Sequence, residues 1–85
     1  MRLDKFLKVS RLIKRRTLAK EIADQGRILV NGNTAKASTT IAVGDELQIQ
    51  FGQKIVILEI NELKEAVKKE EAAQLYTTKK EEYKQ

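Results

Sequence analysis

Apolar residues recur at helical spacing near the start of the chain. Positions 3, 6 and 7 are Leu, Phe and Leu, and they share one side of a helical wheel, opposite basic residues. We therefore expect a helix that begins near Leu3. The charged segment Ser10 to Arg15 is predicted to join it to a second helix, which runs from near Arg16 to Gln25. Gly26 follows at once and suits the left-handed conformation that commonly ends a helix.

Further along the chain, the spacing of apolar residues becomes that of β-strands. Arg27 to Val30 is a short apolar run, and the Asn31-Gly32 pair behind it is typical of a tight hairpin turn. Residues 33–40 are polar and are expected to be irregular. Leu47 to Phe51 alternates apolar residues with glutamine, and Lys54 to Ile60 is a β-branched run. The pattern predicts an α+β fold in which two N-terminal helices pack on a small curved antiparallel sheet.

The last section, residues 61–85, is predicted to be a helix that frays into a tail. Leu63, Ala66 and Val67 can pack against the sheet, and Glu65 can pair with Lys69 across one helical turn. Residues 79–85 have little apolar content and are expected to be mobile. The chain is thus divided into one domain over residues 1–60 and a C-terminal helix and tail over residues 61–85.

Charge is distributed unevenly along the sequence. The net charge of +5 combines ten Lys/Arg against three Asp/Glu in residues 1–36 (+7) with one lysine against three acids in residues 37–60 (−2). In residues 61–85, six lysines meet six glutamates, so that section is neutral. A basic patch confined to one part of a protein is typical of nucleic-acid binding.

Several classes of function are disfavoured by composition. The chain has neither Cys nor His, which removes most zinc sites, thiol nucleophiles and imidazole bases. Asp45 and Glu46 are adjacent carboxylates without a third ligand at a recognisable spacing, so we interpret them as a polar turn. We expect no enzyme, no cofactor and no metal. Without an apolar run of ~20 residues or a signal peptide, the expected location is the cytoplasm.

The candidate phosphate ligands are the cations of the helical section and its edge. Arg and Lys neutralise phosphates and release condensed counterions, and Arg adds bidentate geometry. The alternative is an ordinary solvated helix face, but few acids accompany these cations, and five of the ten Lys/Arg in residues 1–36 are arginine. The predicted RNA-binding residues are Arg2, Lys5, Lys8, Arg11, Lys14, Arg15, Arg16, Lys20 and Arg27.

Three residues of this section have alternative roles. Arg16 and Lys20 are four residues apart and are expected on adjacent turns of the second helix. Pairing with Asp24 would explain Lys20 and leave Arg16 free. Asp4, the acid of the first helix, is interpreted as structural: it either lies at the helix N-terminus, where the dipole favours it, or orients an arginine.

These residues resemble a known motif. Arg2-Leu3-Asp4-Lys5-Phe6-Leu7, Arg11, Arg16-Thr17-Leu18-Ala19 and Gly26-Arg27-Ile28-Leu29-Val30-Asn31-Gly32 together resemble the S-four RNA-binding domain, also called the αL motif. The resemblance spans about Met1 to Ile49. It implies two helices packed on a small curved sheet, with the helical face docked on structured RNA.

Other segments are similar to the RqcP group within that family, and to the fifteen-kilodalton heat-shock protein. They are Lys36-Ala37-Ser38, Gly44-Asp45-Glu46-Leu47, Phe51-Gly52-Gln53-Lys54 and Asn61-Glu62-Leu63-Lys64. The resemblance implies a ribosome-associated factor of translation quality control, and we expect the chain to be a monomer. Its implied partners are ribosomal RNA of the large subunit, peptidyl-tRNA, and a factor that adds a C-terminal tail to the stalled nascent chain.

The chain departs from the heat-shock protein in two ways. The first helix here has Phe6 as its only aromatic residue, and the C-terminal section is short and neutral. RNA contacts from a basic C-terminal extension are therefore not implied. Two other functions stay open: a general ribosomal RNA-binding factor of the heat-shock type, and a protein-interaction adaptor that works through a C-terminal helix near Leu63 to Tyr76.

Overall fold

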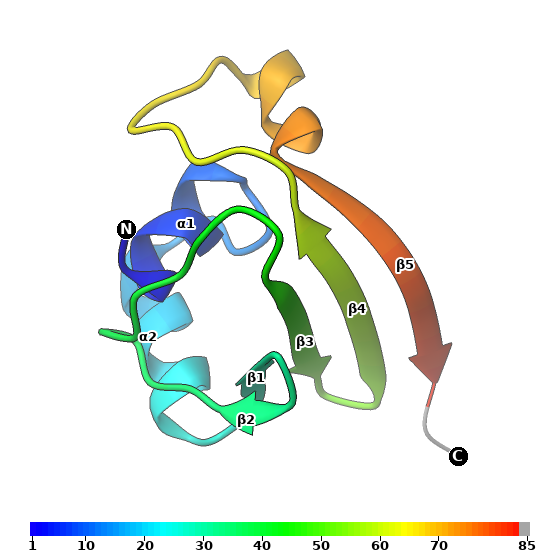
Figure 1. Ribbon diagram of the computed structural model, residues 1–85. Helices are drawn as coiled ribbons and strands as arrows, with labels where there is room; N and C mark the ends of the chain where they lie inside the picture. The colour runs from blue at the N-terminus through cyan, green and yellow to red at the C-terminus, as the bar shows by residue number, and fades with distance from the viewer. Residues whose placement is uncertain (84–85) are drawn as a thin grey trace.

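The computed structural model describes residues 1–83. It confirms the predicted α+β fold: two α-helices pack against a five-stranded antiparallel sheet with the strand order β2-β1-β3-β4-β5 (Figure 1). The elements are α1 (Leu3–Val9), α2 (Arg16–Asp24), β1 (Ile28–Val30), β2 (Asn33–Thr34), β3 (Glu46–Phe51), β4 (Lys54–Ile60), the 3-10 helix η1 (Lys69–Leu75) and β5 (Tyr76–Tyr83).

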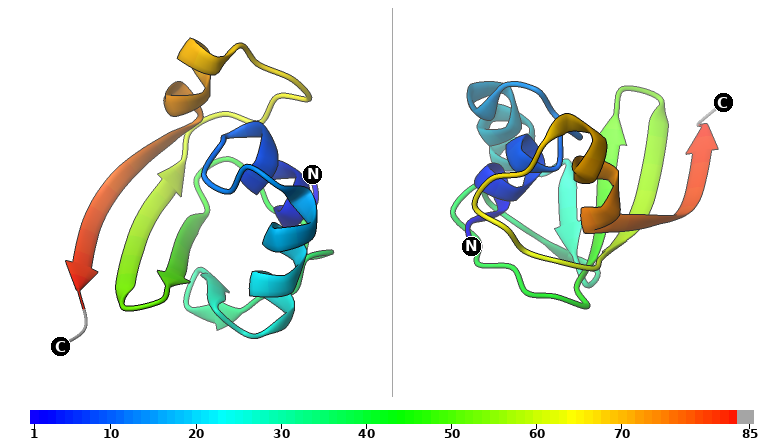
Figure 2. Two further views of the ribbon diagram at one scale, coloured as in Figure 1. Left: turned by 180° about the vertical axis from the view of Figure 1, so that it is seen from behind. Right: turned by 90° about the horizontal axis from the view of Figure 1, so that it is seen from above.

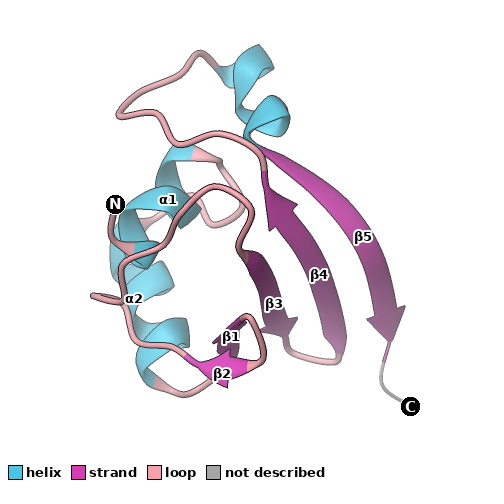
Figure 3. Cartoon of the chain, viewed as in Figure 1, coloured by secondary structure: helices cyan, strands magenta, loops and turns pink. Residues whose placement is uncertain are grey.

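The sheet is curved, and the helices lie on one side of it. Figures 1 and 2 show α1 and α2 together on one side of the sheet, whose two edges are β2 and β5. The segment between β4 and η1 passes over α1 before the chain returns to the sheet (Figure 3). This path brings C-terminal residues beside the N-terminal helix, an arrangement that positions the site described below.

Helix α1 has only seven residues, so its stability depends on acceptors for the free N–H groups at its N-terminus. The N–H groups of Leu3 and Asp4 donate to the carbonyl oxygens of Thr39 and Ala37, at 2.9 and 3.1 Å. The N–H of Lys5 donates to the Asp4 carboxylate at 2.8 Å. Because buried N–H groups without an acceptor are costly, these bonds fix the start of the helix.

The core lies between the helices and the concave side of the sheet. Leu47 pairs with Leu58, and Ile49 with Val56, across β3 and β4, so that their side chains reach the same buried face. The helices contribute further apolar side chains to this cluster, namely Leu3, Phe6, Leu7, Ala19 and Ala23. Within residues 1–83, none of the helices has the length and apolar character that a membrane span requires.

The predicted hairpin turn is confirmed. Asn31 and Gly32 both have positive φ, 51° and 85°, as the turn between β1 and β2 requires. The side chain of Asn31 also holds a second turn, because its amide donates to Asp45 at 3.1 Å and its oxygen accepts the Glu46 N–H at 2.9 Å. Residues 33–40 are not wholly irregular, since Asn33 and Thr34 pair with β1.

The C-terminal section differs most from its prediction. Residues 61–68 form a loop where the start of a helix was predicted, and η1 is the only helical part of this section among the described residues. The predicted mobile tail is wrong as far as Tyr83, because β5 pairs with β4 along its length. Lys84 and Gln85 lie outside the described residues. Leu75 is buried in the core, so this section completes the fold.

Replacing Leu75 by alanine should lower the free energy of unfolding by about 2–5 kcal/mol, because the change leaves a cavity in the core. Gln74, its exposed neighbour in η1, provides the matched control. Gln74→Ala should change the free energy of unfolding by no more than about 0.5 kcal/mol. Urea denaturation followed by circular dichroism measures both values. Equal, small effects would show that η1 is not part of the cooperative core.

Candidate nucleic-acid interface

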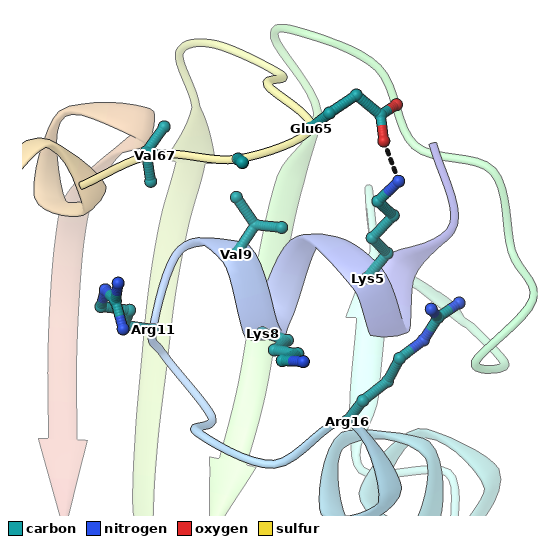
Figure 4. A pocket seen from close by; sticks show the side chains of 8 residues that line it. Lys5, Lys8, Val9, Arg11, Arg16, Glu65 and Val67 are labelled. Atoms are coloured by element: carbon teal, nitrogen blue, oxygen red, sulfur yellow. Dashed lines mark hydrogen bonds and ion pairs between the residues drawn. The ribbon is translucent and has the colours of Figure 1, made fainter. Parts of the chain in front are cut away.

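A shallow pocket of about 310 Å³ lies where α1, the start of α2 and the loop of residues 61–68 meet. We call it the basic pocket, because four of its lining side chains are cations (Figure 4). Its lining residues are Lys5, Lys8, Val9, Arg11, Arg16, Glu65, Ala66 and Val67. The structure thus gathers four of the predicted RNA-binding residues around one hollow.

Asp4 connects this pocket to a fifth predicted residue. Its side chain is only 4% exposed, and its carboxylate faces two arginines. Arg2 approaches with Nε at 3.2 Å and Nη2 at 3.3 Å, and Arg16 approaches with Nε at 3.4 Å. The predicted structural role of Asp4 is confirmed: it orients arginines and lies in the first turn of α1.

The pKa of the Asp4 carboxyl reflects two opposing effects. Burial by itself raises the pKa, because the charged form loses contact with water. Hydrogen bonds and positive charge from Arg16, and then from Arg2, act the other way and prevail, so the pKa lies below its ordinary value of 3.8. At neutral pH the carboxylate is therefore ionised and holds both guanidinium groups.

Both arginines keep enough exposure to bind a ligand as well. The side chains of Arg2 and Arg16 are 51% and 47% exposed, whereas the carboxylate between them is buried. A guanidinium group has five N–H donors, and the contacts to Asp4 use only some of them. The remaining donors can bind phosphate oxygens while Asp4 fixes the orientation of each group.

Arg11 has an unusual backbone. Its φ is 61°, in the left-handed region, and its N–H donates to the carbonyl oxygen of Lys8 at 3.0 Å to end α1. Glycine is the residue usually found here, and another residue costs ~1–2 kcal/mol. The side chain placed by this turn lines the basic pocket and a neighbouring hollow, which is also lined by Lys8, Lys14 and Lys69.

The other predicted cations of the helical section lie outside the basic pocket. Arg15 lines an apolar hollow that contains Leu18 and Phe51, and Lys14 reaches this hollow too. Lys20 lines a depression on α2 itself, so it does not share a pocket with Arg16 although the two are four residues apart. Within residues 1–83, no carboxylate lies within salt-bridge distance of Lys20.

Arg27 stands apart from the helical cations. It is exposed and immediately precedes β1. Its carbonyl oxygen accepts a hydrogen bond from the N–H of Gln50 at 2.9 Å, which ties the residue to the sheet. Arg27 thus lies at the border between the helices and the sheet.

Two residues near the site were not predicted from the sequence to lie there. Lys69 belongs to η1, in a section whose net charge is zero, yet it joins Lys8, Arg11 and Lys14 around one hollow. Glu65 was predicted to pair with Lys69 but pairs with Lys5 instead, because residues 61–68 are not helical. The path of the loop over α1 brings both residues to the site, and no local sequence pattern indicates it.

The turn residues Asp45 and Glu46 have structural roles. Asp45 accepts the N–H of Ala42 at 2.8 Å as well as the Asn31 amide, as expected of a polar turn. In the described part of the chain, no three carboxylate, imidazole or thiol groups gather as a metal site would require. The chemistry that this arrangement supports is the binding of anionic groups by guanidinium and ammonium groups.

Asp4→Asn should lower the free energy of unfolding at pH 7 by about 1–3 kcal/mol, because charge-assisted hydrogen bonds are lost. The depressed pKa of Asp4 means that its stabilising effect is present above the ordinary value of 3.8 and is lost as the pH falls through the folded-state pKa. The difference between wild type and variant should therefore shrink from about pH 5 to about pH 2.

Urea denaturation across this pH range tests the prediction for Asp4. Glu70→Gln is the control, since it removes one negative charge from an exposed position on η1. The role assigned to the ionised carboxylate would be contradicted if wild type and Asp4→Asn differed in free energy of unfolding as much in acid as at neutral pH.

Comparison with known proteins agrees with this architecture. The S4 domain family matches residues 1–47. The RQC P-site tRNA stabilizing factor of Bacillus subtilis is 71% identical over 82 residues, which cover 96% of this chain and 95% of that protein. The protein of the same name from Helicobacter pylori is 38% identical over 73 residues, which cover 82% of this chain and 87% of that protein.

Among solved structures, the trimeric heat shock protein 15 of Vibrio cholerae has the same fold. It aligns with a TM-score of 0.86 at 30% identity, and the alignment covers 93% of this chain and 81% of that chain. The resemblance to the S-four domain, predicted from the residues, is therefore confirmed. The chain belongs to the S4-domain family, in the group that contains the RQC P-site tRNA stabilizing factors.

Proposed function

We propose that this chain is a non-enzymatic factor of ribosome-associated quality control that binds large ribosomal subunits obstructed by peptidyl-tRNA. The observation that carries the proposal is the gathering of Lys5, Lys8, Arg11 and Arg16 around one pocket, with Arg2 linked to it through Asp4. The name of the relatives, RQC P-site tRNA stabilizing factor, supports the assignment to quality control and to tRNA.

The contact with RNA is electrostatic and depends on shape. Phosphates of ribosomal RNA and tRNA lie against the face formed by α1 and the start of α2, and the sheet acts as a rigid platform behind it. Arg2 and Arg16 are already oriented by Asp4, so fewer side-chain rotations are lost on binding. Arg15, Lys20 and Arg27 extend the contact on either side. Folded RNA is generally recognised in this way.

The role on the obstructed subunit is to hold the tRNA. While the tRNA is held, a tailing factor extends the C-terminus of the stalled nascent chain. The chain acts in the cytoplasm as a ribosome-associated monomer and needs no cofactor, since binding alone accounts for the role.

The alternative of an adaptor that works through its C-terminal helix is less well supported. Ala72 and Leu75, the buried apolar residues of η1, face inward and pack in the fold. Helix η1 therefore offers a partner mainly polar side chains. The second alternative, a general ribosomal RNA-binding factor, makes a different prediction about peptidyl-tRNA and is separated by the following experiment.

Sedimentation with purified particles tests the proposed function. The protein should bind large subunits that carry peptidyl-tRNA more tightly than empty large subunits, because the tRNA adds phosphates within its reach. Equal binding to both particles would favour a general ribosomal RNA-binding factor. Absence of binding to either particle would contradict the proposal.

Arg16→Ala should weaken binding to the tRNA-bearing subunit about tenfold, because one charge-assisted contact is lost. The slope of log affinity against log salt concentration should become shallower by about one, because one phosphate contact is lost. Lys80→Ala removes the same charge from β5 and should leave both quantities nearly unchanged. An Arg16→Ala protein that folds normally and keeps wild-type affinity and slope would exclude Arg16 from the interface.

A further inference from the structure

The loop of residues 61–68 places a negative charge inside the basic pocket. Glu65 forms an ion pair with Lys5 across the space between the loop and α1 (Figure 4). Among the described residues, Glu65 is the only acidic side chain that lines this pocket, whose other charged residues are Lys5, Lys8, Arg11 and Arg16. Its carboxylate thus occupies a position beside the ammonium group of Lys5.

The backbone around Glu65 is anchored on both sides. Leu63 and Val67 are half-buried and pack against the core. At the start of the loop, the N–H groups of Asn61 and Glu62 both donate to the carbonyl oxygen of Leu75, at 2.8 and 3.3 Å. The loop therefore holds Glu65 beside α1 as a fixed part of the fold.

The side chain of Glu65, in contrast, is free to move. It is 77% exposed, so rotation about its own bonds can take the carboxylate away from Lys5 without displacing the loop. An ion pair between exposed groups contributes little to stability, because water solvates both partners well when they separate. The pair therefore costs little to break, and a well-placed phosphate can displace the carboxylate from Lys5.

We propose that Glu65 is an internal competitor for RNA phosphate at Lys5. This inference rests on the proposed function and adds to it: the carboxylate neutralises Lys5 in the free protein and is displaced when the RNA backbone enters the basic pocket. RNA that reaches Lys8, Arg11 and Arg16 together compensates for the broken pair. A ligand that offers a single phosphate at Lys5 does not.

The competitor also changes how binding depends on salt. A lysine already paired with a carboxylate exchanges one anionic partner for another, so its engagement releases fewer ions than that of a free lysine. Removing the carboxylate while keeping the shape of the side chain should restore the full contribution of Lys5. Glu65→Gln is the variant that makes this change.

The test compares Glu65→Gln with Glu62→Gln in binding to large subunits that carry peptidyl-tRNA, over a range of salt concentrations. Glu62 lies in the same loop, is exposed, and pairs with Lys64 at 3.8 Å, outside the basic pocket. Each substitution removes a single negative charge, so the two variants have the same net charge. We expect Glu65→Gln to bind about twofold to fivefold more tightly than wild type, with a salt slope steeper by about one. Glu62→Gln should change neither appreciably.

A double-mutant cycle with Lys5→Gln isolates the pair. In the Lys5→Gln background, Glu65→Gln should have no more effect than Glu62→Gln, because the cation for which it competes is absent. Equal effects of Glu65→Gln and Glu62→Gln in the wild-type background would overturn the inference and leave the proposed function intact. Loss of subunit binding by the wild-type protein itself would instead overturn the proposed function, and this inference with it.

Discussion

The carboxylate of Asp4 is withdrawn from water in the first turn of α1, and the positions of Arg2 and of Arg16 in the basic pocket depend on it. A buried charge is tolerated only when it is paired and hydrogen-bonded, and here Arg2, Arg16 and the N–H of Lys5 supply the pairing. Arg16 begins α2, so the same contact joins the starts of two helices that are separated by a six-residue connection, residues 10–15. One acid thereby sets the relative position of cations from two elements.

Several features of the fold follow from local sequence and could be predicted. The two helices were predicted from their apolar arcs, and the turn at Asn31-Gly32 from its composition, because these signals act over a few residues. Strand β3 shows its buried face as alternation in the sequence, and β4 was predicted from its run of β-branched residues. The predicted part of the site is of the same kind, since it relies on the local density of cations.

The C-terminal section could not be predicted in this way. Strand β5 has the sequence YTTKKEEY and pairs with only one neighbour among the described strands, so seven of its eight residues are exposed and no apolar alternation marks it. Its conformation is decided by hydrogen bonding to β4, which is a tertiary effect. The charges of both signs on this edge also oppose pairing with the edge of another sheet. The positions of Glu65 and Lys69 beside α1 are also a tertiary effect, because they depend on the path of the chain after β4. They could therefore not be predicted from local sequence.

The way in which α1 begins has a consequence for the order of folding. An isolated helix in water needs ~12–15 residues to persist, and α1 has seven, with its first N–H groups donating to carbonyl groups of Ala37 and Thr39. The helix therefore depends on the loop that caps it, and that loop in turn leads into the sheet. We expect contacts between residues distant in sequence to form together with the helix, so that the basic pocket assembles with the sheet.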